Sequence, residues 1–166
     1  MPNAVSNSSP LIHLAAINHF HLLKHYFDRV CIPAAVWHEV VDSGDERPGV
    51  AEVTRAADQG WLEVVSFENQ PLAQSLQREL HRGEAEAIVL ALDQQADVVL
   101  LDETEARKVA ERFGLVKTGV LGLLMRARRE SKVASLQTQL ARLRDEAGFW
   151  IADDLYSVAL KAVGEI

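Results

Sequence analysis

The chain has 166 residues, of which 48% are hydrophobic and 25% charged, proportions typical of a soluble globular protein with a hydrophobic core. Its longest apolar runs, at 87–92 and 98–101, are far shorter than the roughly 18 residues of a membrane span, so we expect no membrane association. The formal net charge of −7 argues against nonspecific nucleic-acid affinity over the whole surface.

Short apolar runs alternate along the chain with segments whose apolar residues recur at helical spacing. We expect helices at 10–17, 21–27, 33–41, 48–59, 71–81, 83–95, 104–113, 120–130, 135–147 and 153–163. We expect strands at 4–6, 29–32, 61–67, 97–101 and 115–117, and a loop at 42–49. The pattern predicts one α/β domain over residues 1–166, with a parallel sheet between two helical layers. The apolar strand at 97–101 should be central, and the strand at 61–67 should lie at an edge.

Ligands of such sheets bind beyond the carboxyl ends of the strands, so the residues at those ends are the first candidates for a site. After the first strand, Ser6, Asn7, Ser8 and Ser9 precede Pro10. One interpretation is a capped helix start, with Ser9 as N-cap and Pro10 as the first helical residue. The other is a site with Asn7 at its centre.

Two glutamates stand at the start of the apolar helix expected at 83–95. Glu84 and Glu86 are two residues apart and therefore point about 200° apart around the helix. Glu84 lies in the first turn, where free N–H groups favour a carboxylate, so an ordinary structural role is expected. Glu86 leads into a run that is apolar on every side, and a buried carboxylate there needs a partner or a metal.

Three more acids follow the strand at 97–101. Asp102 as N-cap with Glu105 three residues later is a capping arrangement, but a cap needs only one acid. At least one of Asp102 and Glu103 is therefore a candidate functional residue. Glu39, late on the helix expected at 33–41, would by itself be an exposed helical glutamate.

Several carboxylates at one edge of a sheet suit Mg²⁺ or Mn²⁺, which prefer oxygen ligands. The chain has no zinc-ligand pattern, no glycine-rich phosphate loop, and no evident base beside Ser8 or Ser9. Segment 104–132 holds eight basic residues against three acidic ones, which allows either a local contact with a polyanion or a solvated helical face. Cys31 is the only cysteine, and the N-terminus does not read as a signal peptide, so we expect a cytoplasmic protein.

The ordered set of stretches SNSSPLI, IPAAVWHEV, GEAEAIVLAL, LLDETEAR, TGVLGLL and the terminal VGE resembles the PIN-domain family. The similarity is greatest to the VapC-like toxins of toxin–antitoxin pairs. The resemblance implies a three-layer α/β/α sandwich with a central parallel sheet and an acidic cluster that holds Mg²⁺ or Mn²⁺. It also implies a ribonuclease that cleaves RNA by water attack, often as a homodimer and often restrained by a small antitoxin protein.

The resemblance also assigns site residues. The first family aspartate falls on Asn7, the second acid on Glu39 and the third on Glu86. The fourth falls on Glu103 or on Asp102, and the match does not decide between them.

The resemblance thus implies a catalytic role for Asn7, Glu39, Glu86 and Asp102, and it implies that these four residues and Glu103 bind the metal. In this hypothesis Ser8 and Ser9 position water or phosphate, while Arg107, Lys108 and Arg126 guide RNA. Asn7 departs from the family pattern because its amide is neutral, which weakens attraction for a divalent ion.

The sequence also bears on two other functions. The neutral Asn7 also fits a catalytically weak or inactive PIN-like module that binds RNA or a protein. A phospho-acceptor receiver domain is disfavoured because neither VSNSS nor WLEVVSF carries the aspartates that such a domain needs at its strand ends.

Overall fold

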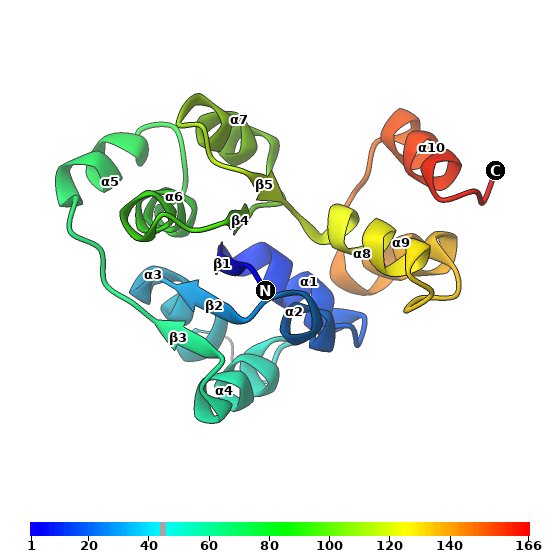
Figure 1. Ribbon diagram of the computed structural model, residues 1–166, viewed down its shortest axis with the longest axis horizontal. Helices are drawn as coiled ribbons and strands as arrows, with labels where there is room; N and C mark the ends of the chain where they lie inside the picture. The colour runs from blue at the N-terminus through cyan, green and yellow to red at the C-terminus, as the bar shows by residue number, and fades with distance from the viewer. Residues whose placement is uncertain (44–45) are drawn as a thin grey trace.

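A five-stranded, all-parallel sheet forms the centre of the computed structural model, which describes residues 1–43 and 46–166 (Figure 1). The strands are β1 (Asn3–Ser6), β2 (Arg29–Ile32), β3 (Leu62–Val64), β4 (Val98–Leu100) and β5 (Lys117–Thr118). Their order across the sheet is β3-β2-β1-β4-β5, and every neighbouring pair is parallel. The expected edge position of β3 is confirmed. The middle strand is β1, whereas β4 was expected there.

Helices and one π-helical turn cover both faces of this sheet. Their bounds are α1 (Ser8–Ala16), α2 (His21–Tyr26), α3 (Ala34–Trp37), η1 (His38–Asp42), α4 (Val50–Gln59), α5 (Gln70–Leu76), α6 (Arg82–Gln94), α7 (Thr104–Arg112), α8 (Val120–Arg129), α9 (Leu136–Ala147) and α10 (Asp153–Ala162). Figure 1 shows α5, α6 and α7 above the sheet, and α1, α2 and α4 below it. The predicted three-layer α/β/α architecture is therefore confirmed.

β1, β2 and β4 each contribute to two hydrophobic cores, because successive side chains of a strand point to opposite faces of the sheet. Val98 and Leu100 pack with α1, α2, α8 and α9 in one core, whereas Val99 and Leu101 pack with α5, α6 and α7 in the other. The uninterrupted apolar run of β4 thus reflects burial on both faces, as expected. The strand nevertheless lies one place from the edge, with the two-residue β5 outside it.

The first helix begins earlier than the sequence predicts. α1 starts at Ser8 with Asn7 at its N-cap, so the expected N-cap role of Ser9 is wrong, and Pro10 is the third helical residue. Asn7 N donates to Leu100 O at 3.1 Å, so the sheet contact persists to Asn7 and the helix follows at once. Pro10 is tolerated there because N–H groups in the first turn need no helical partner.

The segment after β2 also differs from the sequence prediction. Instead of one α-helix over 33–41, the chain forms α3 and then the π-helical turn η1, which carries Glu39. Such a turn inserts an extra residue and re-aims the side chains that follow it, often at functional sites. Residues 44 and 45 of the loop expected at 42–49 lie outside the described residues.

None of the described helices combines the length and apolar character required to cross a membrane. Cys31 is buried in β2, and burial raises the pKa of its thiol.

Candidate active site

Asn7 lies at the carboxyl end of the middle strand, where its backbone is fixed on both sides. Its N–H donates to Leu100 O at 3.1 Å, and Ser6 Oγ donates to its carbonyl at 2.8 Å. The side chain occupies an N-cap position but makes no capping hydrogen bond. Asn7 is only 4% exposed, and its Oδ1 is buried without a hydrogen-bond partner in the described part of the chain. An unpaired buried acceptor is costly, so this oxygen is suited to receive a ligand.

Glu39 is brought to Asn7 from the neighbouring strand by η1. Ser8 Oγ donates to Glu39 Oε2 at 2.6 Å, so the first residue of α1 holds the carboxylate in place. Glu39 is an exposed residue, which leaves its carboxylate open to solvent on one side. Ser8, itself buried, thus orients an acid that lies 31 positions away in the sequence.

Gly83, in the first turn of α6, completes this contact. A Cβ at Gly83 would lie 2.5 Å from Glu39 Oε1 and 3.0 Å from Asn7 Oδ1. Both oxygens therefore reach the same point on the α6 backbone, at a position that has no room for a side chain. The end of β1 and the starts of η1 and α6 converge there.

Glu86 lies one helical turn beyond Gly83 and on nearly the same face of α6. Its side chain is only 6% exposed, and Arg82 Nε donates to its Oε2 at 2.7 Å. The expectation that a buried glutamate needs a partner is met here by Arg82. The hydrogen bond and the negative charge of Glu86 raise the pKa of Arg82. Arg82 is 71% exposed at its side chain, so solvent can reach this ion pair.

Glu84 has the structural role expected of it. Its Oε1 accepts a hydrogen bond from His81 N at 3.0 Å, as part of a capping box at the start of α6. This satisfies one of the free N–H groups at the helix start.

Asp102 is not the N-cap of α7, contrary to expectation; Glu103 holds that position and makes no side-chain capping bond. Asp102 Oδ1 instead accepts from Val120 N at 2.8 Å, and Oδ2 lies 2.8 Å from His13 Nδ1. The first N–H of α8 lies opposite the end of β4 and attracts this carboxylate. With 1% of its side chain exposed, Asp102 links α1, β4 and α8.

Glu103 is exposed and lines a surface hollow together with Glu84 and His81. The two candidates for the fourth acid therefore have different surroundings: Asp102 faces α1 and α8, whereas Glu103 faces the start of α6. Asp102 already has partners for both oxygens, and Glu103 does not make a capping bond.

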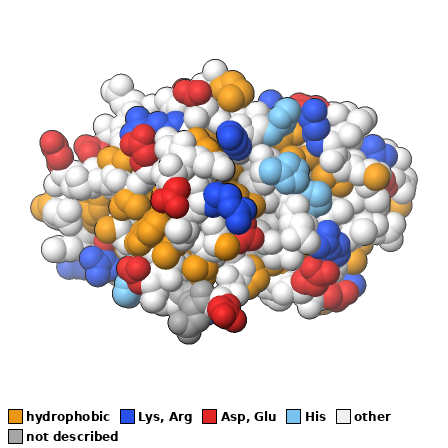
Figure 2. All heavy atoms as spheres, turned by 90° about the horizontal axis from the view of Figure 1, so that it is seen from below, with side chains coloured by type: hydrophobic (Ala, Val, Ile, Leu, Met, Phe, Trp, Pro, Cys, Tyr) orange, Lys and Arg blue, Asp and Glu red, His pale blue; other side chains and the backbone are white. Residues whose placement is uncertain are grey.

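The predicted RNA-binding residues have different partners. Arg107 Nη1 donates to Leu101 O at 3.1 Å, and Lys108 Nζ lies 3.6 Å from Glu105. The Arg126 guanidinium lies 4.1 Å above the ring of Tyr26. On the face in Figure 2, basic and acidic side chains are interspersed, so that face presents no one-signed field. Ser9 is half-buried in the first turn of α1.

The donor set around Gly83 fits a hard divalent cation. Within residues 1–43 and 46–166, no three His, Cys, Asp or Glu side chains are gathered closely enough to hold a metal. Mg²⁺, however, commonly takes one or two carboxylates and keeps several waters. Glu39 supplies a carboxylate, Asn7 supplies an unpaired amide oxygen, and Glu86 stands one turn away.

The sequence reasoning missed three residues of this region. Arg82 could have been found, because it precedes Glu86 by four residues and such pairs meet on a helix. Gly83 had no distinguishing signal beyond being a glycine at a helix start. His13 could not have been paired with Asp102, which lies 89 positions away.

Comparison with curated proteins gives no match. The family model DUF3368, described as a PIN domain, matches residues 3–165 and so covers nearly the whole chain. PIN domains are generally nucleases, and the parallel sheet with acids beyond its strand ends is consistent with that fold. The chain therefore belongs to the PIN-domain family.

Proposed function

We propose that this PIN-domain protein is a ribonuclease that hydrolyses phosphodiester bonds with Mg²⁺ or Mn²⁺ as cofactor. One observation carries the proposal: the unpaired Oδ1 of buried Asn7 and the carboxylate of Glu39 both reach the backbone at Gly83. Two oxygen donors, one at the end of β1 and one on η1 after β2, thus meet at the start of α6, in the region where ligands of parallel sheets bind. A divalent ion bound there would polarise a phosphate and make a bound water more acidic.

The chain's own residues have distinct tasks in this proposal. Ser8 fixes Glu39 through its 2.6 Å hydrogen bond, and Asn7 directs a neutral oxygen toward the same point. Glu86 adds a second carboxylate when Arg82 turns out to solvent, which its exposure permits. Glu103 or Asp102 supplies the fourth acid, and Ser9 contributes to positioning water or phosphate.

The biological role that we propose is that of a VapC-like toxin in the cytoplasm, which forms a homodimer and is restrained by a small antitoxin protein. The motif set SNSSPLI, GEAEAIVLAL and LLDETEAR supports this part of the proposal. Arg107, Lys108 and Arg126 would guide the RNA.

The test is RNA degradation by purified protein in Mg²⁺ or Mn²⁺, with and without EDTA. We expect Glu39→Gln and Glu86→Gln to slow cleavage by at least about tenfold, because each removes a charge from the site. Glu84→Gln is the matched control, since it changes a glutamate of the same helix that only caps it. Degradation that resists EDTA and both site substitutions would overturn the proposal.

A second candidate function rests on the charges of the same residues. Asn7 is neutral, Glu86 is paired with Arg82, and Asp102 has both oxygens bound. These features also suit a PIN-like module that binds RNA or a protein without cutting. Calorimetry distinguishes the two: a protein that takes up no Mn²⁺, even as Asn7→Asp, supports the non-catalytic module.

A further inference from the structure

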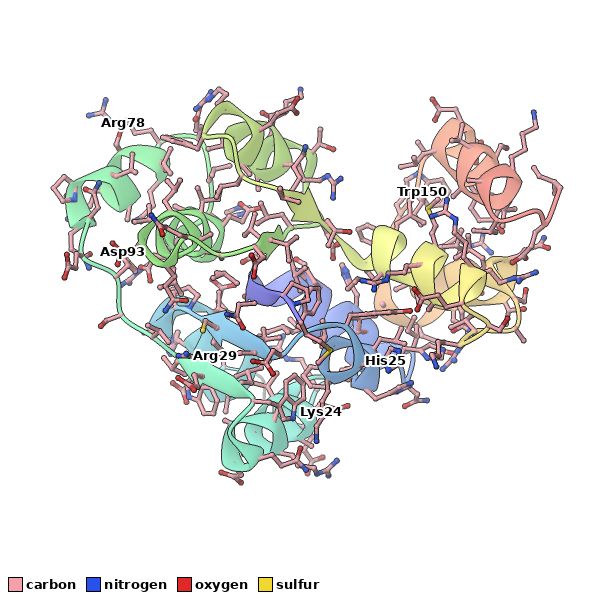
Figure 3. The ribbon with its side chains drawn as sticks, viewed as in Figure 1. Lys24, His25, Arg29, Arg78, Asp93 and Trp150 are labelled. Atoms are coloured by element: carbon pink, nitrogen blue, oxygen red, sulfur yellow. The ribbon has the colours of Figure 1, made fainter. Side chains whose placement is uncertain are left out.

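A second cavity opens beyond the end of β4, on the side of the sheet edge away from Glu39. It has a volume of about 480 Å³ and lies between the 102–125 segment and the residues that lead into α10. Arg107 and Thr118 line one wall, and Phe149 and Trp150 line the other. Figure 3 places Trp150 on the connection between α9 and α10. This aromatic wall was not predicted from the sequence.

The aromatic wall is connected to the end of β4. Trp150 has 71% of its surface exposed. An indole exposed to this degree contributes little to the hydrophobic core, so core packing does not account for it. Its neighbour Phe149 packs against the ring of His13, with 4.6 Å between ring centroids. His13 in turn contacts Asp102. The exposed indole of Trp150 therefore follows directly on a residue that is connected, through His13 and Asp102, to the end of β4.

The opposite wall offers hydrogen-bond donors. Arg107 is half-buried, and its Nη1 donates to the carbonyl of Leu101 at 3.1 Å. Asp102 lines the same cavity, but its two oxygens are bound to Val120 N and His13. In the described part of the chain Arg107 forms no ion pair with a carboxylate, so most of its five N–H donors remain for a ligand.

These walls together select the chemistry of the occupant. An apolar helix laid in the cavity would cover the guanidinium donors of Arg107 without partners, which is unfavourable. A phosphate satisfies them, because the guanidinium fork matches its oxygens. The exposed face of Trp150 provides a platform on which an unpaired base can stack. A base in a duplex is stacked on its neighbours and cannot reach such a platform.

We propose that this cavity holds one nucleotide of single-stranded RNA, with its base stacked on Trp150 and a phosphate bound by Arg107. The inference rests on the ribonuclease function proposed above and names a substrate subsite for it. The hydrogen bond from Asn7 N to Leu100 O places the end of β1 directly beside the end of β4. A strand of RNA anchored in the cavity can therefore continue toward Asn7.

The test is binding of a 5′-labelled single-stranded oligoribonucleotide in EDTA, so that no cleavage occurs. We expect Trp150→Ala to weaken binding by about 5- to 150-fold, the range for loss of one stacked base, and Trp150→Phe to restore most of it. Arg107→Gln should reduce the slope of log affinity against log salt by about 0.7, as for one lost phosphate contact. Arg55→Gln, on α4 and distant in the fold, is the matched control and should leave binding unchanged.

The outcomes separate this inference from the nuclease proposal. If the wild type cleaves RNA in Mg²⁺ but Trp150→Ala binds RNA normally, the subsite is refuted and the nuclease function stands. If RNA binding depends on Trp150 but no RNA is ever cut, the subsite stands and the nuclease function fails. If Trp150→Ala instead abolishes self-association in sedimentation and leaves RNA binding intact, the surface docks protein and the inference is overturned.

Discussion

Gly83→Ala is the substitution that most directly tests the geometry of the candidate site. The added Cβ would stand 2.5 Å from Glu39 Oε1 and 3.0 Å from Asn7 Oδ1, closer than carbon and oxygen atoms pack. Asn7 is buried and fixed by its backbone bonds, whereas Glu39 is exposed and can turn away. We therefore expect the carboxylate of Glu39 to be displaced and the Ser8 hydrogen bond to be lost.

The expected effects on stability and on cation binding have different sizes. Alanine is favoured over glycine in a helix by about 1 kcal/mol, less in a first turn, and this gain offsets the loss of the exposed Glu39 contact. The free energy of unfolding should thus change by less than about 1 kcal/mol. Loss of one of the two converging oxygens should weaken Mn²⁺ binding by at least about tenfold, which corresponds to about 1.4 kcal/mol.

The assay combines calorimetric titration with Mn²⁺ and thermal unfolding followed by circular dichroism. Gly122→Ala, in α8, is the matched control, because its Cβ would collide with the hydroxyl of Thr118 in β5, away from Gly83. That variant should lose stability while retaining cation affinity. Wild-type Mn²⁺ affinity in Gly83→Ala would refute the convergence of Asn7 and Glu39 on a cation.

Three further substitutions test the charges that surround the site and the C-terminus. Arg82→Gln should lower the free energy of unfolding in the absence of metal by about 1–2 kcal/mol, because Glu86 loses its partner; denaturant titration measures this effect. The same substitution should raise the affinity for Mn²⁺, which calorimetry measures. Asn7→Asp should bind Mn²⁺ more tightly and gain more thermal stability from it than the wild type does, and equal gains would contradict the assignment of Asn7. Glu165→Ala should cost about 1.5–3 kcal/mol near neutral pH, because Glu165 accepts from Leu136 N and Gln137 N and pairs with Arg128. Burial acts to raise the pKa of Glu165, but these hydrogen bonds and Arg128 hold it below 4.5. The contribution of Glu165 to the free energy of unfolding is therefore present above pH 4.5 and is lost as the pH falls below that value. Urea unfolding at several pH values should show that the difference in stability between Glu165→Ala and the wild type disappears in acid.

The architecture could be predicted because it depends on local patterns. The alternation of strands and helices indicated a parallel sheet, and the apolar run at 98–101 indicated a strand buried on both faces. The position of β1 in the middle of the sheet could not be predicted. It follows from pairings with β2 and β4, which join residues far apart in the sequence and leave no mark on either strand.

The site was predictable to a similar extent. The candidate acids were found from burial arguments and from the family resemblance. Arg82, the partner of Glu86, could have been predicted from its position four residues earlier on the same helix. The environment of Asp102 could not, because its partners come from α1 and α8. The sequence pattern predicted that the Asp102 carboxylate caps α7. In the structure this carboxylate instead accepts a hydrogen bond from the N–H of Val120, which is distant in the sequence.

The neutral side chain at position 7 has a physical consequence for the whole site. An aspartate there would be a buried carboxylate close to the charge of Glu39, and none of the described residues donates a hydrogen bond to the oxygen at the place of Asn7 Oδ1. Without a cation, burial and repulsion would both destabilise such a charge. Asn7 removes that cost, and Arg82 removes the corresponding cost for Glu86. We therefore expect a fold that is stable without metal and binds a divalent ion more weakly than an all-carboxylate site would, so that activity depends on the cation concentration.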